Sequence, residues 1–435
     1  MLPTPRLLAL LALPAALLAA ASAVPGLLVL AVLGWLAALA LVGAEWRLTP
    51  DGALAVGRRH EPRLSLGADN LVWLDVENRT GRALAVTLRD AVPPSCVASA
   101  EFVRGLVPAH RQASLRYTLR PLRRGDHKLG DVTARWRGPL GLLDRQESYP
   151  LAELVKVYPN LLDLRKYDLL VRRGRLVEAG LRASRRFDSG TEFESLRDYQ
   201  PDDDYRRINW KATARRGHPM TAEFETERSQ NVLVMLDAGR LMSTAVGALN
   251  KLDHAVNTSL LLAYVAGLRG DRVGMLAFAD RVLAYLPPRR GKRPFYVMLE
   301  ALYNLEPEPV EPDFDAVFRF LAARSLRRSL LVVFTDLTDR DVSSSLVQHL
   351  ARLARHHLAL CVTLGDPQVV ALAEATPAST AALYERVVAG RLLEERAEVL
   401  GALRRRGVLT LDVPADRLSV AVVNKYLELK ARTRI

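Results

Sequence analysis

Cysteine is scarce in this sequence of 435 residues, and the common catalytic motifs are missing. The two cysteines, Cys96 and Cys361, lie far apart, which excludes a disulfide framework and a cysteine-based zinc site. The eight histidines show no HExxH pattern, and no P-loop, GxSxG or GxGxxG stands at a strand-to-helix turn. The sequence therefore gives no direct sign of a metalloprotease, a nucleotide-binding enzyme or a serine hydrolase.

A concentrated basic region is also missing, although the net charge is +13. The excess of basic residues is +1 over residues 1–44, +5 over 45–160, +2 over 161–230 and +5 over 231–435. Nucleic-acid-binding proteins gather their positive charge on one face, so this even spread argues against a nucleic-acid partner. It is typical of a protein that works beside an anionic lipid bilayer.

No charged residue lies between Arg6 and Glu45. This run is too long for one membrane span and predicts a hairpin of two, at residues 7–24 and 26–44, with a turn at Pro25-Gly26. Arginines precede and follow the pair but are absent from the turn, so the positive-inside rule places both ends in the cytoplasm. We therefore expect a multi-pass membrane protein whose soluble domains face the cytoplasm.

A secretory signal is the alternative interpretation of the N-terminus. Arg6, the first apolar stretch and Ala21-Ser22-Ala23 match the three parts of a cleavable signal. Cleavage would leave the second apolar segment as an anchor and the body of the protein outside the cell.

Residues 45–160 show short alternating runs separated by Gly, Pro and Asn turns, which predict an antiparallel β-sandwich. This domain carries no catalytic constellation, so we interpret it as a spacer or binding module. The strands are expected at residues 71–77, 83–88, 113–119, 131–136 and 154–158.

Residues 161–230 are the most unusual segment. Asp202 is a good N-cap and Gly217 a good stop, so the sequence predicts a helix between them. Trp210 on this helix is expected to pack against the sheet. Asp202–Asp204 could bind a cation, and the charges at 192, 197 and 198 could form a catalytic set. Solvated caps and ion pairs are the simpler interpretation of both groups.

Residues 231–435 alternate between buried apolar runs and helical periodicity, which predicts a mostly parallel, doubly wound α/β sheet. Strands are expected at 231–236, 272–278, 282–286, 329–334, 358–364 and 408–413. Helices are expected at 252–268, 294–305, 314–323, 343–357, 382–405 and 418–429.

Three of these strands are followed at once by a carboxylate, at Asp237, Asp336 and Asp366. Ligands of such sheets bind beyond the carboxyl ends of the strands. Converging carboxylates could hold Mg²⁺, which prefers oxygen ligands. Acidic residues also occur at strand ends without any metal.

Several motifs resemble the bacterial membrane proteins classed as domain of unknown function 58. The resemblance rests on residues 190–193, 196–199, 201–204, 206, 208–211 and 214–215, with Arg124-Gly125, 138–142, Tyr158-Pro159, 270–274 and 334–337 on either side. It covers essentially the whole chain. By this resemblance we assign a family signature that would contact partners: Glu192, Phe193, Arg197, Asp198, Tyr199, Asp202, Asp204, Arg206, Asn209, Trp210, Lys211 and Arg215.

The resemblance implies a von Willebrand factor A-like domain at the C-terminus, a membrane hairpin in a bacterial inner membrane, and a MoxR-type AAA+ ATPase as partner. Such domains usually bind through a metal-ion-dependent adhesion site that begins with Asp-x-Ser-x-Ser. Here that place reads Asp237-Ala238-Gly239-Arg240-Leu241, and the final Asp is assigned to Asp336. With both serines lost, Asp237 and Asp336 would form a degenerate Mg²⁺ site.

Three functions follow from these observations. The first is a membrane-anchored adaptor without enzymatic turnover that binds a MoxR-type ATPase and other proteins during assembly or maturation. The second is a metal-dependent hydrolase that uses Asp237, Asp336 and the 202–204 cluster. The third is an extracellular anchored adhesion protein, which requires the signal-peptide topology.

Overall fold

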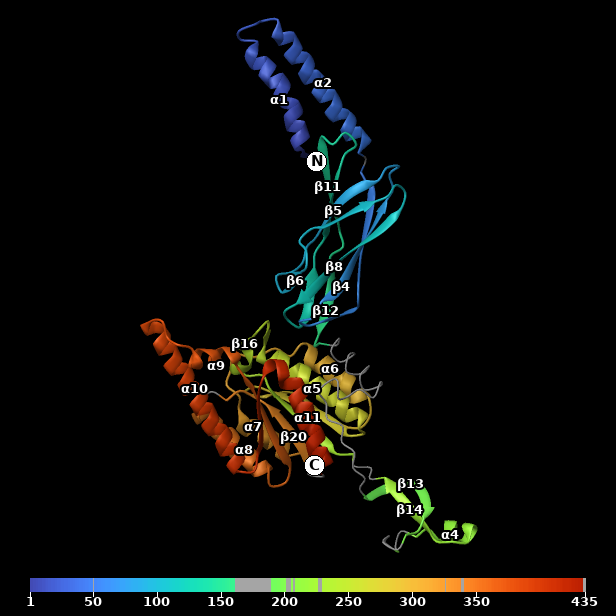
Figure 1. Ribbon diagram of the computed structural model, residues 1–435, viewed down its shortest axis with the longest axis vertical. Helices are drawn as coiled ribbons and strands as arrows, with labels where there is room; N and C mark the ends of the chain where they lie inside the picture. Colours follow the sequence, from blue (N-terminus) through green and yellow to red (C-terminus); the bar gives the residue numbers. More distant parts are fainter. Residues whose placement is uncertain are drawn as a thin grey trace. The chain divides into compact units, whose positions relative to one another are not determined.

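The structure is a computed structural model that describes residues 1–49, 51–160, 189–200, 205, 208–225, 229–324, 326–337 and 340–432. The chain divides into two compact units, Met1–Leu161 and Leu162–Ile435. The first contains two helices and a set of β-sheets, and the second is a mixed α/β unit (Figure 1).

Two apolar helices begin the first unit, α1 (Pro5–Ala20) and α2 (Leu27–Leu48). Within the described part of the chain, α2 is the one helix that is long and apolar enough to cross a membrane, and α1 is a shorter apolar helix. The boundaries differ from the sequence prediction, because α1 ends before Val24 and α2 continues past Ala44. The helix α2 can continue past Ala44 because the carboxylate of Glu45 finds hydrogen-bond donors inside the protein.

Glu45 is fully buried near the end of α2. Its carboxylate accepts hydrogen bonds from the backbone N–H groups of Gly141 at 2.8 Å, Leu142 at 2.9 Å and Leu143 at 3.0 Å. Gly141 and Leu142 lie in the turn between β10 (Val132–Arg137) and β11 (Leu143–Tyr149), and Leu143 begins β11. Hydrogen bonds to a charged group contribute about 1.5–3 kcal/mol each, so this turn fixes the end of α2 to the β-sheets.

The same turn also holds the start of the chain. The hydroxyl of Thr4 donates to the carbonyl oxygen of Gly141 at 2.7 Å, and its backbone N–H donates to that of Leu142 at 3.0 Å. The short strand β1 (Leu2–Pro3) pairs with β11. Both apolar helices are therefore anchored on one turn.

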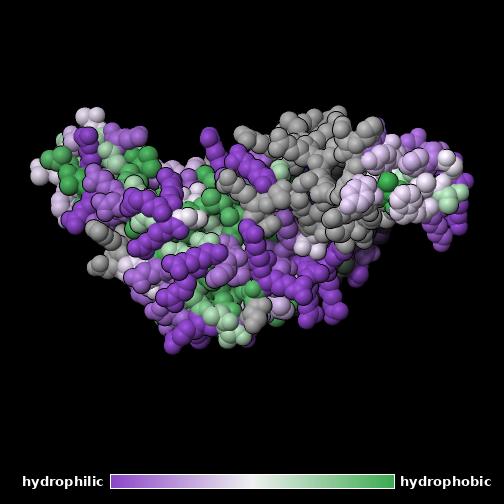
Figure 2. Space-filling model, turned by 90° about the horizontal axis from the view of Figure 1, so that it is seen from below, coloured by the Kyte–Doolittle hydropathy of each residue, from purple (hydrophilic) through white to green (hydrophobic). Residues whose placement is uncertain are grey.

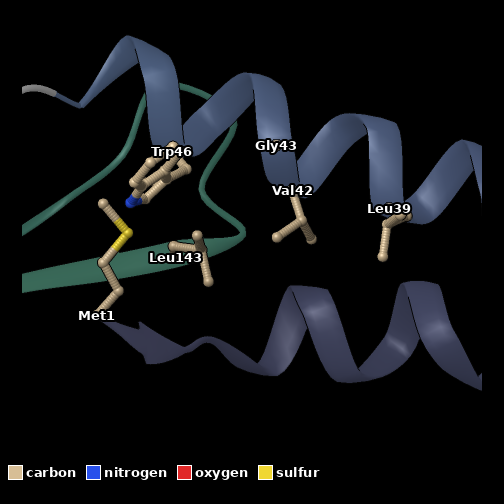
Figure 3. A pocket seen from close by; sticks show the side chains of 6 residues that line it. All are labelled: Met1, Leu39, Val42, Gly43, Trp46 and Leu143. Carbon is tan, nitrogen blue, oxygen red and sulfur yellow. The ribbon is translucent and has the colours of Figure 1, made fainter.

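An open apolar groove of about 620 Å³ lies beside this anchor. Leu39, Val42 and Trp46 point into it from α2, and Met1 and Leu143 lie opposite them (Figure 3). Trp46 remains 63% exposed. An apolar surface that ends in an exposed tryptophan is typical of the boundary between lipid and water.

The β-sheets of the first unit are almost entirely antiparallel. They have the strand orders β1-β11-β10-β5-β7, β2-β4-β8-β6 and β3-β12-β9, and β3 with β12 is the one parallel pair among the described strands of this unit. All five strands expected from the sequence are present. The other strands of this unit are β2 (Leu54–His60), β3 (Arg63–Ser65), β4 (Asn70–Asn78), β5 (Leu84–Asp90), β6 (Cys96–Ala98), β7 (Val103–Val107), β8 (Gln112–Pro121), β9 (Gly125–Leu129) and β12 (Glu153–Tyr158).

The second unit is built on a six-stranded sheet of order β19-β18-β15-β20-β21-β22, in which all pairs are parallel except β18 with β19. Its strands are β15 (Asn231–Asp237), β18 (Arg272–Phe278), β19 (Val282–Arg289), β20 (Ser329–Phe334), β21 (Leu358–Gly365) and β22 (Leu409–Pro414). All six were expected from the sequence, and the central strands β15, β18, β20 and β21 have continuous apolar runs because both of their faces are covered.

Helices cover both faces of this sheet. On one face, Leu233, Met235, Leu331 and Val333 share a core with α7, α8 and α10. On the other face, α5 contacts β15, β18 and α11. The helices are α5 (Lys251–Leu268), α6 (Arg293–Tyr303), α7 (Phe314–Ala322), α8 (Arg340–Leu353), α9 (Pro367–Glu374), α10 (Thr380–Arg405) and α11 (Leu418–Ala431); a small hairpin, β16 (Ala245–Val246) and β17 (Leu249–Asn250), precedes α5.

Gly138 tests the anchor of α2, because a Cβ built there would lie 2.1 Å from the Glu45 carboxylate oxygen. We expect Gly138→Ala to displace the carboxylate and to destabilise the first unit by about 2–4 kcal/mol. Gly43→Ala is the matched control on α2, since nothing lies within 4 Å of its Cβ position. Thermal unfolding followed by tryptophan fluorescence measures the effect. Equal midpoints for the two variants would contradict it.

Candidate functional site

The candidate site lies where β15 and β20 end side by side. The two strands are parallel neighbours, and Leu236 pairs with Phe334. Asp237 closes β15, and Thr335-Asp336 follows β20. The predicted pair of carboxylates is therefore brought to one edge of the sheet, hereafter the strand-end rim.

Asp237 is almost fully buried, and each of its carboxylate oxygens accepts a hydrogen bond from a neighbouring residue. Its Oδ1 accepts from the backbone N–H of Gly239 at 2.7 Å, and its Oδ2 accepts from the hydroxyl of Thr335 at 2.6 Å. Burial raises the pKa of Asp237 to about 6, against the lowering effect of these hydrogen bonds, and the nearby Asp336 carboxylate raises it further.

Asp336 is held by two cations. Its Oδ2 lies 2.5 Å from the ammonium of Lys251 and its Oδ1 lies 2.7 Å from the guanidinium of Arg396. The backbone N–H of Leu337 donates to the same Oδ1 at 2.9 Å. Arg396 also pairs with Asp412 on β22 at 2.7 Å. The four charged side chains form one connected network, in which the side chain of Asp336 is only 1% exposed.

These donors do not fit the Mg²⁺ site that the resemblance implies. Magnesium requires about six oxygens in octahedral geometry, whereas Gly239 and Leu241 replace the two hydroxyls and both carboxylates already have partners. Within the described residues, no group of three or more His, Cys, Asp or Glu side chains is placed to hold a metal ion. Asp366 is not part of the cluster; it caps α9 by accepting from the N–H of Gln368.

Sequence reasoning missed Lys251, Arg396 and Asp412. One signal was available for Lys251, which occupies the first position of α5. A cation is unfavourable there because of the helix dipole. A lysine at this position therefore predicts a carboxylate partner elsewhere in the fold, although the sequence alone does not identify that partner.

The family signature falls on a separate hairpin of β13 (Ser189–Asp198) and β14 (Met220–Glu225). Glu192 pairs with Glu225, Phe193 with Phe224, Arg197 with Thr221 and Asp198 with Met220. The Oδ1 of Asp198 lies 2.8 Å from Nε2 of His218. The backbone N–H of Tyr199 donates to the carbonyl oxygen of Pro219. Asp202, Asp204 and Arg206 lie outside the described residues.

The predicted helix of the signature begins later than expected. The helix α4 spans Trp210–Arg216, and its N-cap is Asn209, whose side chain accepts from the N–H of Ala212. Ile208 forms a β-bridge with Thr221, so the chain just before the cap is extended and Asp202 is not the cap of this helix. Gly217 ends the helix in the left-handed region, as predicted.

Trp210 is 71% exposed. The expectation that it packs against the sheet is therefore wrong. Lys211 and Arg215 are also exposed on this helix. The signature thus presents an aromatic ring and two cations at its surface.

A second exposed surface lies on α9 and the first half of α10, and sequence reasoning did not single it out. Its large apolar side chains are 38–72% exposed: Val370, Leu372, Leu383, Tyr384, Val387, Val388 and Leu392. In Figure 2 hydrophobic side chains gather at the left edge, where Figure 1 has α9 and the start of α10. We call these seven residues the α9–α10 surface. Spacings of four residues within α10 were the available signal.

The comparisons with known proteins agree with the resemblance. The sequence profile of the family described as "Protein of unknown function DUF58" matches residues 195–380. The chain is 23% identical over 258 residues to "Uncharacterized protein Rv1480" of Mycobacterium tuberculosis, which covers 56% of this chain and 80% of that protein. It is 26% identical over 232 residues to "Uncharacterized protein YeaD" of Bacillus subtilis, covering 53% of this chain and 56% of that protein.

Among solved structures, the chain is similar to the SpRpn10 VWA domain. The sequence identity is 12%, the TM-score is 0.29, and the match covers 45% of this chain and 93% of that domain. This likeness is too low to decide the fold, which rests on the strand order and pairing described above.

Asp237 predicts a specific pH dependence of stability. Its pKa is higher in the folded state than the ordinary value of 3.8, so the folded protein binds this proton more tightly than the unfolded protein does. Its contribution to stability therefore falls by roughly 2–3 kcal/mol as the pH rises from about 4 to about 6.

We expect Asp237→Asn to remove this fall, so that the variant gains stability relative to the wild type across that range. The measurement is chemical denaturation of both proteins at a series of pH values, followed by circular dichroism. Taking the difference cancels the other titrating groups, and parallel pH curves would contradict the prediction.

Proposed function

We propose that this chain, which matches the DUF58 family over residues 195–380, is a membrane-anchored protein-binding adaptor without enzymatic turnover. The observation that carries the proposal is the α9–α10 surface. Monomeric soluble domains rarely expose large contiguous apolar patches, and such patches mark sites of interaction. The strand-end rim, where a small-molecule substrate would bind in this kind of sheet, is instead filled by paired charges.

We further assign the second unit to the doubly wound von Willebrand factor A-like type and the β-sheets of the first unit to a sandwich. Five parallel strands, one antiparallel edge strand and helices on both faces support the first assignment. Alternating burial supports the second, as in β4, where Val72, Leu74 and Val76 are buried.

The membrane anchor in this proposal is the hairpin of α1 and α2, in a bacterial inner membrane with both soluble units in the cytoplasm. The apolar surfaces of both helices are exposed, and Arg6 and Arg47 lie at the end where the β-sheets begin. The positive-inside rule favours this end for the cytoplasm. The three hydrogen bonds to Glu45 would then connect the bilayer directly to the β-sheets.

As partner we propose a MoxR-type AAA+ ATPase, by the family resemblance, in the assembly or maturation of other proteins. Two surfaces of suitable chemistry are available to it. The α9–α10 surface is apolar, and α4 offers an exposed tryptophan beside two cations. Trp, Tyr and Arg side chains are enriched among the few residues that carry most of the binding energy in protein interfaces, and Trp210, Arg215 and Tyr384 are exposed residues of these types.

Val388→Asp tests the α9–α10 surface. We expect it to reduce binding of the co-expressed MoxR-type ATPase by about 10-fold or more, because a charge replaces an apolar contact in an interface core. Val297→Asp on α6 is the matched control, since both valines are 40% exposed. Binding is measured by co-purification and by titration with the purified ATPase. Equal binding of the two variants would exclude this surface.

Reporter fusions test the topology. Green fluorescent protein at the C-terminus should fluoresce and alkaline phosphatase there should be inactive, because the proposal places that end in the cytoplasm. Alkaline phosphatase inserted after Pro25, between the two helices, should be active. An active phosphatase at the C-terminus would instead support the extracellular anchored protein.

A further inference from the structure

The unusual residue of the strand-end rim is Lys251. It occupies the first position of α5, behind an Asn250–Asp253 capping box. The positive end of the helix dipole disfavours a cation at this position, yet the Lys251 side chain is only 6% exposed. A buried ammonium is tolerated only where a carboxylate and hydrogen bonds compensate it, and Asp336 provides that compensation at 2.5 Å.

The remaining positions around the two carboxylates are also filled. Arg396 and the N–H of Leu337 hold the other oxygen of Asp336. A side chain at residue 239 would be crowded, because its Cβ would lie 3.0 Å from the Asp237 carboxylate and 3.0 Å from the Val310 carbonyl oxygen. The backbone path therefore disfavours a serine at this position.

We propose that the ammonium of Lys251 permanently takes the place of a divalent cation at this rim. It contributes the positive charge that joins the end of β20 to the start of α5, and the rim is thereby closed to metal ions. The consequence is functional as well as structural. A protein that binds at this edge therefore does so without Mg²⁺, and chelators do not weaken that binding. The proposal does not rest on the adaptor function.

The test is cation replacement in the full-length protein, purified in detergent. Lys251→Ala leaves Asp336 with one cation partner and an empty space beside it. We expect a midpoint of thermal unfolding several degrees lower than that of the wild type, and recovery of at least half of this loss with about 10 mM MnCl₂ or MgCl₂. The wild-type midpoint should be the same in these salts and in EDTA.

Lys430→Ala is the control for a general salt effect. Lys430 pairs at 2.6 Å with Asp271, whose side chain is fully buried, but Tyr426 rather than a second cation holds the other oxygen. We expect this variant to be destabilised without recovery in divalent salts. Recovery of both variants to the same extent would show a nonspecific effect and overturn the proposal.

Two further outcomes would overturn it. One is a saturable heat of Mg²⁺ or Mn²⁺ binding to the wild type that disappears in Asp336→Ala, since the rim would then accept a metal beside Lys251. The other is a Lys251→Ala variant that gains nothing from divalent cations. If Lys251→Ala does not fold, Lys251→Met preserves most of the side-chain volume, and the wild-type titration alone still decides whether the rim accepts a metal.

Discussion

A buried carboxylate has to find its hydrogen-bond donors and its counter-charge inside the protein, and this constraint shapes both units. Leaving such a group without partners costs several kcal/mol. In the first unit, Glu45 is surrounded by backbone N–H groups of the β10–β11 turn. In the second, Asp336 is surrounded by Lys251, Arg396 and a backbone N–H. Each carboxylate therefore dictates the path of distant chain segments and ties them together.

The constraint explains two motifs that the sequence analysis assigned only by resemblance. Gly138 and Gly141 stand in the turn that receives Glu45, where a side chain at 138 would strike the carboxylate and residue 141 has a positive φ of 75°. Asp271 follows Gly270 and accepts from Tyr426 and Lys430 of the last helix. Both motifs thus hold separate elements together, and neither needs a ligand to account for it.

The alternation of strands and helices in the second unit could be read from the sequence because fully buried strands have continuous apolar runs. The runs at Arg272–Phe278 and Ser329–Phe334 agree with the observed strands residue for residue. The pairs that decide the site could not be read in this way. Lys251 and Asp336 are 85 residues apart, and Glu45 and Gly141 are 96 apart, so no local pattern connects them. The helix at α4 was placed too early because Asp202 and Asn209 are equally good caps, and only the bridge between Ile208 and Thr221 decides between them.

The charge network also bears on the exposed half of α10. The second half of this helix packs into the core through Val399, Leu400 and Leu403, whereas the first half carries most of the α9–α10 surface. Arg396 stands between the two halves and binds both Asp336 and Asp412, beyond the end of β20 and on β22. The C-terminal end of the exposed half is therefore held by the two ion pairs of Arg396, one with the residue just beyond β20 and one with β22. A rigid apolar surface loses little conformational entropy when a partner covers it, so the buried charges of the strand-end rim favour binding at a surface that they do not themselves touch.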